Sequence, residues 1–242
     1  MIFQRQNFNI ILIGTIFLLF STRLLFSSET IPDGPHKTYY KSGKLFQQGF
    51  FKGGVKDGLF RKYYENGKVE SEVNFINGKA QGEAKLYYES GALKETELYI
   101  DSKAEGPFKV YYENGKLMED GVLINSQKED LVRKYYYDGK LRSEVIYASG
   151  KRKGAYKKYH ENGNLRETGT YKDGQIDGFL KTYHENGKLR MEGFYSDGKR
   201  DGLLKIYFET GQLRTEMLFK KGKLEHPVKK YDENGTLIDE RK

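Results

Sequence analysis

The sequence predicts an all-β protein: an elongated, single-layer antiparallel meander of β-hairpin repeats that follows an N-terminal hydrophobic helix. One observation behind this prediction is a 24-residue repeat that recurs about nine times without a change of length. Another is the pair of aromatic, β-prone runs in each repeat, both ending in turn residues. The third is the frequency of glycine, which excludes a solenoid built from helices. Together they favour one continuous array over the one or two conventional domains that 242 residues allow.

Composition narrows the function classes. The chain has 42 Lys+Arg and 34 Asp+Glu, a net charge of +8, and 14% aromatic residues with only four prolines. This aromatic content argues against disorder. The absence of cysteine excludes disulfides, Cys-ligated metal sites and a thiol nucleophile. We therefore expect an ordered, basic, aromatic-rich protein.

Residues 1–28 differ from the rest of the chain. A short basic start with Arg5 precedes an uninterrupted apolar run of 13 residues at 8–20, which is too short to span a bilayer and suits a signal peptide. Cleavage after Ser27 or Ser28 is one outcome, and an uncleaved signal anchor over residues 8–26, which includes Arg23, is the other. Residues 29–36 are then a linker and residues 37–242 the repeat array, and the predicted location is the cell envelope or the outside of the cell.

The repeat is anchored by a glycine in segments such as ENGKL. These glycines are Gly43, Gly67, Gly91, Gly115, Gly139, Gly163, Gly187, Gly211 and Gly235. Every interval is 24 residues, so each residue has a fixed place in a stacked unit. We number positions in a unit relative to this glycine.

Three columns recur in all nine units: Tyr at −4, Lys or Arg at −6, and Leu or Val at +2. A second turn follows at +10 and +11, as in Asn77 and Gly78. Placing positions −1 and 0 at the centre of a type I′ turn puts −3 opposite +2, −4 opposite +3 and −6 opposite +5. That register predicts six cross-strand ion pairs: Arg61 with Glu72, Lys109 with Asp120, Arg133 with Glu144, Lys181 with Glu192, Lys205 with Glu216 and Lys229 with Glu240. It also puts −7, −3, +2 and +8 on an apolar face and −6, −4, +3 and +5 on the other.

The unit at residues 60–82, FRKYYENGKVESEVNFINGKAQG, resembles the bacterial variant of the MORN repeat, often labelled YwqK-type antitoxin proteins. The match is best at residues 159–178 and 183–202 and covers the chain from about residue 35 to 242. Three units depart from the pattern. Ser102 and Ser126 replace the second glycine of the unit, at +11, and Asp130 and His226 replace the third, at +15. We expect altered turns there. The resemblance implies a β-hairpin repeat with a binding or scaffolding role and no catalysis.

The tyrosine and basic columns are the candidate binding site, because Tyr rings interleaved with Lys and Arg can bind glycans, anionic lipid headgroups, nucleic acid or an acidic protein surface through stacking and charge. The alternative is a self-satisfying array in which the basic column pairs with the acids at +5. Arginines at +3 in four consecutive units favour the C-terminal half. The candidate partner-binding residues are Tyr135, Tyr159, Tyr183, Tyr207, Lys157, Arg142, Arg166, Arg190 and Arg214.

No catalytic, cofactor or metal site is predicted. His160 and His184 occupy the same position in adjacent units, where two strand spacings keep them roughly 9 to 10 Å apart, too far to share a metal. We interpret them instead as aromatic substitutions at a Tyr or Phe position. The carboxylates recur once per repeat, whereas a catalytic group would break the repeat symmetry.

The sequence therefore favours a non-enzymatic, exported or membrane-anchored repeat protein that binds a protein partner through an extended sheet. The alternatives are an antitoxin or immunity protein that neutralises a toxin by direct contact, and a peripheral binder of anionic lipid or glycan. No nucleic acid is expected, and a homodimer through the apolar sheet face is an open alternative. An antitoxin against an intracellular toxin should not be exported, so location separates the first two readings.

Overall fold

A computed structural model describes residues 31–241 of the chain. All regular structure in this range is β, in one sheet of 20 strands. The strands are β1 Gly34–Tyr39, β2 Leu45–Lys52, β3 Val55–Tyr63, β4 Val69–Ile76, β5 Lys79–Ala80, β6 Gly82–Tyr87, β7 Leu93–Ile100, β8 Lys103–Tyr111, β9 Leu117–Ile124, β10 Gln127–Tyr135, β11 Leu141–Ala148, β12 Lys151–Tyr159, β13 Leu165–Lys172, β14 Gln175–Ile176, β15 Gly178–Tyr183, β16 Leu189–Ser196, β17 Lys199–Tyr207, β18 Leu213–Lys220, β19 Lys223–Tyr231 and β20 Leu237–Arg241. Residues 31–241 contain no helix long and apolar enough to cross a bilayer. The expected N-terminal helix and the signal segment at 1–28 lie outside the described residues.

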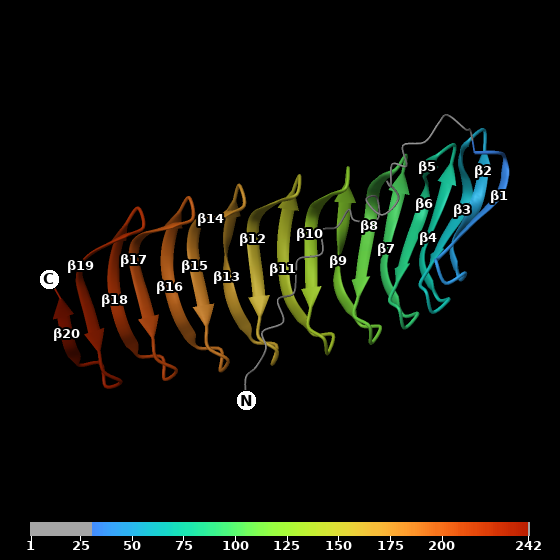
Figure 1. Ribbon diagram of the computed structural model, residues 1–242. Coiled ribbons are helices and arrows are strands. Elements are labelled where there is room, and N and C mark those ends of the chain that lie inside the picture. Colours follow the sequence, from blue (N-terminus) through green and yellow to red (C-terminus); the bar gives the residue numbers. More distant parts are fainter. Residues whose placement is uncertain (1–30, 242) are drawn as a thin grey trace.

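The sheet is the predicted antiparallel meander, in which each hairpin pairs with the next (Figure 1). Strands β5 and β6 both pair with β4, and β14 and β15 both pair with β13. Each of these two pairs is therefore one strand that is interrupted next to the third glycine of the unit, Gly82 or Gly178. The array is a single layer from its blue N-terminal end to its red C-terminal end. The all-β repeat fold predicted from the sequence is therefore confirmed.

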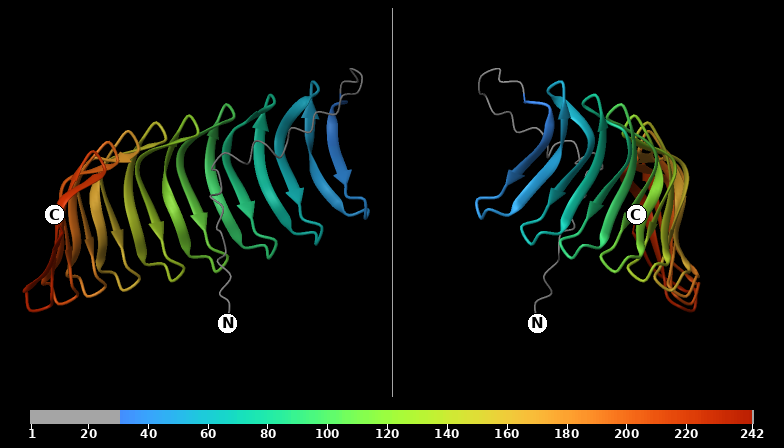
Figure 2. Two further views of the ribbon diagram at one scale, coloured as in Figure 1. Left: turned by 60° about the vertical axis from the view of Figure 1, so that its left-hand side comes forward. Right: turned by 90° about the vertical axis from the view of Figure 1, so that its right-hand side faces the viewer.

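The single layer buries a core because its strands bend. Figure 2 shows the strands curving to the same side along the array. On one face, which we call the packed face, Phe60 is only 2% exposed, and its ring contacts the rings of Phe51 and Phe75 edge-on, with centroids 5.4 and 5.3 Å apart. A Cβ on Gly49 would come within 2.4 Å of the Phe60 ring, so the neighbouring strand is a glycine where the aromatic ring lies across it. Curvature and aromatic size together replace the second layer that most sheets need.

The first turn differs from the predicted type I′ turn. The Tyr64 N–H donates to the Lys68 carbonyl at 2.8 Å, and the Gly67 N–H donates to the Tyr64 carbonyl at 2.9 Å. Gly67 has φ +85°, whereas Asn66 is not in the left-handed region. These features define a three-residue loop with a type I turn and a left-handed glycine. The type I′ assignment at this turn was therefore wrong.

The strand register nevertheless follows the prediction, because a β-bulge compensates for the longer loop. Tyr63 lies opposite Val69, Glu70 is the extra residue, and from there Arg61 lies opposite Glu72 as predicted. Since residues opposite one another share a face, position +2 belongs with the tyrosine at −4 and not with the apolar face at −7. The predicted face of position +2 is therefore corrected.

The second turns keep one geometry even where glycine is missing. Ser102 and Ser126 have φ +69° and +62°, in the region that Gly78 occupies at φ +79°. Their hydroxyls accept hydrogen bonds from the Ala80 and Ala104 amides at 2.9 and 3.0 Å. The altered turns expected at these two serines are therefore not present, and each serine adds a hydrogen bond that ties its turn to the preceding hairpin.

Neighbouring hairpins are also joined through position −3. The Tyr64 hydroxyl donates to the Tyr87 carbonyl at 2.7 Å, and the Tyr136 hydroxyl donates to the Tyr159 carbonyl at 2.6 Å. His160 occupies the same place, with Nε2 at 3.0 Å from the Tyr183 carbonyl, so its Nε2 carries the proton. His184 repeats this contact with the Tyr207 carbonyl at 3.1 Å. The prediction that the two histidines substitute for tyrosine is confirmed.

Candidate functional site

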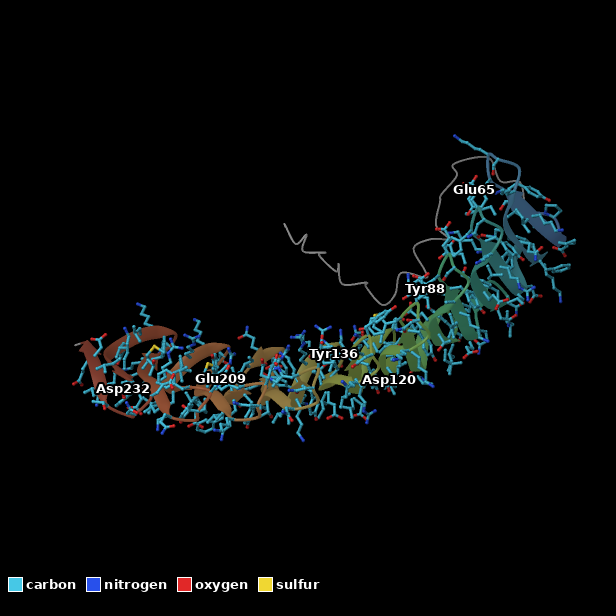
Figure 3. The ribbon with its side chains drawn as sticks, turned by 90° about the horizontal axis from the view of Figure 1, so that it is seen from below. Glu65, Tyr88, Asp120, Tyr136, Glu209 and Asp232 are labelled. Carbon is cyan, nitrogen blue, oxygen red and sulfur yellow. The ribbon has the colours of Figure 1, made fainter. Side chains whose placement is uncertain are left out.

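The face opposite the packed face carries the tyrosine column, and we call it the tyrosine face. Figure 3 shows Tyr88, at position −3, and Asp120, at position +5, on opposite sides of the ribbon. On the tyrosine face, the first strand of each hairpin presents positions −8, −6 and −4, and the second strand presents positions +2, +5 and +7. No other element of residues 31–241 covers this face, so an external partner can reach it.

Most of the basic column is ion-paired as predicted. The Arg61 Nε lies 2.7 Å from Glu72 Oε1, and four more of the six predicted pairs form at 3.6 to 3.9 Å. The exception is Lys109, which lies opposite Asp120 but has no ion pair with it; Arg133 approaches Asp120 at 3.8 Å instead. Because these pairs are partly exposed, they order the side chains of this face but add little to the stability of the fold.

The tyrosine column binds the same acids from the next hairpin. The Tyr159 hydroxyl donates to Glu144 at 3.0 Å, and the Tyr207 hydroxyl donates to Glu192 at 2.8 Å. Burial raises the pKa of Tyr207 to about 12, and the hydrogen bond to Glu192 adds to this shift. Burial also raises the pKa of Tyr135 to about 12, and there the hydrogen bond to Asp120 adds to the shift. Three of the four candidate tyrosines are therefore neutral hydrogen-bond donors already engaged within the array. The self-satisfying alternative predicted the ion pairs of the basic column but not these tyrosine hydrogen bonds.

Tyr183 and Lys157 interrupt this arrangement. They flank Thr168, which stands at position +5, where six of the nine units carry an acid. Lys157 is exposed and makes no ion pair among the described residues, although Glu144 lies opposite it on the adjacent strand. The Tyr183 hydroxyl likewise has no internal partner in this part of the chain. Strands β12, β13 and β15 therefore present an unneutralised cation and a free hydroxyl on the tyrosine face.

The candidate arginines lie elsewhere than expected. Arg142, Arg166, Arg190 and Arg214 are the bulge residues at +3 of their hairpins. The Arg142 guanidinium lies 5.7 Å from the Tyr136 ring centroid, and that of Arg214 lies 5.5 Å from the Phe208 centroid. Both rings are at position −3, on the packed-face side. The expectation that these arginines share a face with the tyrosine column is wrong, because the bulge turns position +3 to the other side.

A row of exposed apolar side chains crosses the tyrosine face near the second turns, which the sequence reading missed. Phe179, Phe194, Leu203 and Leu218 come from β15, β16, β17 and β18 and are 38 to 66% exposed. Phe179 lies opposite Phe194, with ring centroids 5.3 Å apart, and Leu203 lies opposite Leu218. We call these four residues the apolar row. The signal was available at positions −8 and +7, whose apolar residues alternate with charges on the same face.

The packed face buries two neighbouring carboxylates on β7, Glu95 at position +4 and Glu97 at position +6, and most units carry Gly or Val at +6. Glu97 is 1% exposed, its Oε2 accepts from the Tyr99 hydroxyl at 2.6 Å, and its Oε1 has no partner. Burial, reinforced by the charge of Glu97, raises the pKa of Glu95 to about 8. Burial also raises the pKa of Glu97. No group of three or more metal-ligating side chains forms within residues 31–241. The raised pKa values make this pair a buried proton site.

A curved, single-layer array of in-register hairpins with one face packed and one face open is a repeat module for binding. Eight segments match the family described as MORN repeat variant, at residues 32–52, 56–77, 80–101, 104–125, 131–149, 152–173, 177–197 and 200–221. The chain belongs to this family, whose repeats are commonly protein- or membrane-binding modules. No curated protein sequence matches the chain.

Proposed function

We propose that this protein is a non-enzymatic scaffold that binds a protein partner through the tyrosine face of its C-terminal half. The single observation that supports this most directly is the apolar row, because four apolar side chains on successive strands lie exposed on this face, with Phe179 at 66% more exposed than any large apolar residue at these positions in the other units. Exposed, contiguous apolar side chains with a polar surround are typical of protein interfaces. Phe179, the most exposed of the four, is the candidate anchor.

The charged surroundings favour a protein over a membrane. Glu192 and Glu216 lie two residues before Phe194 and Leu218 on the same face, with ion pairs to Lys181 and Lys205 at 3.6 Å. A lipid surface would remove water from these carboxylates without replacing their hydrogen bonds. A protein partner can supply donors to them while it covers the apolar row.

The test is capture of partners by immobilised protein from an envelope extract. We expect the double variant Phe179→Asp and Leu203→Asp to lose a protein that the wild type retains. Asn74→Asp is the matched control, because Asn74 occupies position +7 outside the apolar row. Equal capture by the wild type and the double variant, with both folded by circular dichroism, refutes the proposal.

We also propose that the array lies outside the cytoplasm, exported or held at the membrane by residues 1–28. The support is the apolar run at 8–20 behind a basic start. Cell fractionation with sizing of the mature N-terminus tests this. Full-length chain found soluble in the cytoplasm contradicts export and makes the antitoxin alternative the better reading.

A further inference from the structure

The second turns carry a repeated hydrogen bond that fails at one place. In six of the eight second turns, the amide at +10 donates to the side chain at +14 of the preceding unit, 20 residues earlier. The six bonds are Gly53 to Asp33 at 2.6 Å, Asp101 to Gln81 at 3.1 Å, Asn125 to Glu105 at 2.8 Å, Ser149 to Glu129 at 2.6 Å, Asp197 to Asp177 at 3.1 Å and Lys221 to Asp201 at 3.1 Å. An oxygen acceptor, in five of the six a carboxylate, is thus part of the repeat.

At Asp173 this acceptor is replaced by a cation. The residue 20 positions earlier is Lys153, the only basic residue at +14. The Asp173 amide has no acceptor within the described part of the chain. The turn at Asn77 also lacks the bond, but there Asp57 still offers a carboxylate. Among the eight second turns, only the one at Asp173 has a residue at +14, Lys153, whose side chain cannot accept a hydrogen bond from the turn amide.

Other cations gather where the carboxylate is missing. Lys151, Arg152, Lys153 and Lys172 line one hollow of about 560 Å³ together with Thr170. The Arg152 guanidinium lies 5.3 Å from the Tyr171 ring centroid and donates to its hydroxyl at 3.4 Å, which holds it in place. The lysines have no ion pair among residues 31–241.

Two carboxylates also line this hollow, and neither takes the vacant place. Asp177 Oδ2 accepts from the Asp197 amide, in the next turn along the array. Asp173 belongs to the turn itself, at φ +50°, and is exposed. The Arg152 side chain lies with Tyr171 on the packed-face side. Three lysines therefore remain to face two carboxylates, and the Asp173 amide adds a donor.

We propose that this hollow, the Lys153 site, binds a carboxylate from an acidic segment of the protein partner, in the place that the chain's own carboxylate takes in other turns. The assignment rests on the proposed function and adds the chemistry of the partner. The bound oxygen accepts from the Asp173 amide and is charge-paired with Lys153 and Lys172. Thr170 lies beside Gly178, whose added Cβ would be 4.0 Å from it, and Phe179 follows directly. The Lys153 site and the apolar row are thus continuous, so the partner segment is acidic and apolar.

The test uses a fluorescein-labelled peptide of eight glutamates, with a peptide of eight glutamines as its control, in fluorescence anisotropy at low salt. We expect the glutamate peptide alone to bind, and Lys153→Glu to weaken it by about tenfold, the loss of one charge-assisted hydrogen bond with its ion pair. Lys199→Glu makes the same charge change at an exposed position outside the hollow and is expected to weaken binding less than about twofold. The ¹H–¹⁵N signal of the Asp173 amide should shift as the peptide binds.

Lys153→Glu restores the acceptor of the other turns, so its thermal midpoint is expected to equal or exceed that of the wild type. Equal weakening by Lys153→Glu and Lys199→Glu, or an unmoved Asp173 amide, overturns the proposal in favour of diffuse charge attraction. Vesicles of phosphatidylserine and phosphatidylcholine form a second arm. If vesicles depend on Lys153 and the glutamate peptide does not bind, the ligand is a lipid headgroup and the protein assignment is wrong. The apolar-row variants test the proposed function separately.

Discussion

The buried pair Glu95 and Glu97 makes the stability of the array depend on pH in an unusual direction. Most carboxylates in proteins have lowered pKa values and stabilise the fold as pH rises. Here burial raises the pKa of Glu95 from 4.5 to about 8, and that of Glu97 is also raised. The folded state therefore holds a proton that the unfolded chain releases above pH 4.5. The stability from these groups is complete below pH 4.5 and is lost as pH rises toward 8.

The magnitude follows from the same values. One extra proton bound by the folded state corresponds to about 1.4 kcal/mol per pH unit. Between pH 5 and pH 8 the free energy of unfolding should fall by about 4 kcal/mol. The neighbours that face the pair directly are Leu86 and Ala84 on β6 and Val110 and Phe108 on β8, all apolar. After burial, the charge of Glu97 acts most strongly on Glu95, and Lys94 and Glu119 have smaller effects.

The perturbation is the double variant Glu95→Gln and Glu97→Gln, which keeps shape and removes both titrating groups. Urea unfolding followed by circular dichroism at pH 5, 6, 7 and 8 measures the slope. We expect the wild type to lose stability across this range and the double variant to lose much less, so the variant is the more stable at pH 8. A wild type with flat or rising stability from pH 5 to 8, or a double variant with the same slope, refutes the reasoning.

Three further predictions are each tested by urea unfolding. Phe60→Ala should cost about 3 to 5 kcal/mol, because its ring is buried between two others, whereas Phe179→Ala should cost less than about 0.5 kcal/mol; similar losses would contradict the assignment of faces. Glu72→Gln should cost about 1 kcal/mol at pH 7, and the cost should shrink as pH falls through the lowered pKa of Glu72; an unchanged cost at pH 3 would count against the ion pair with Arg61. His160→Ala should cost about 1 kcal/mol and His160→Tyr should not, and equal losses would disprove the shared hydrogen bond at −3.

The repeat let the sequence predict the fold almost completely. A constant interval of 24 residues and charges that matched across the hairpin were enough to assign the pairing of Arg61 with Glu72, which the structure confirms. The loop geometry was not predictable in the same way. A three-residue loop with a bulge at Glu70 gives the same distant register as a two-residue turn without a bulge, so the ion pairs could not distinguish them.

That local ambiguity decided which site residues were placed correctly. Tyr159 and Lys157 precede the turn, and their face follows from the strand alone. Arg142 and Arg214 sit at the bulge, where one inserted residue reverses the direction of the side chain. Lys153 escaped notice because its role depends on an amide 20 residues away, and only the structure shows that this amide normally has a carboxylate acceptor.

Photo-crosslinking tests the central claim, that the tyrosine face binds a protein partner, most directly. A benzoylphenylalanine in place of Phe179 reports contacts at the apolar row, and one in place of Tyr112 reports contacts at the packed face, where the Tyr112 hydroxyl bonds to the Tyr135 carbonyl at 2.8 Å. The account predicts a discrete protein adduct from position 179 and none from position 112. Two results would contradict it. One is an adduct from position 112 alone, and the other is no protein adduct from position 179 in intact cells that produce the protein.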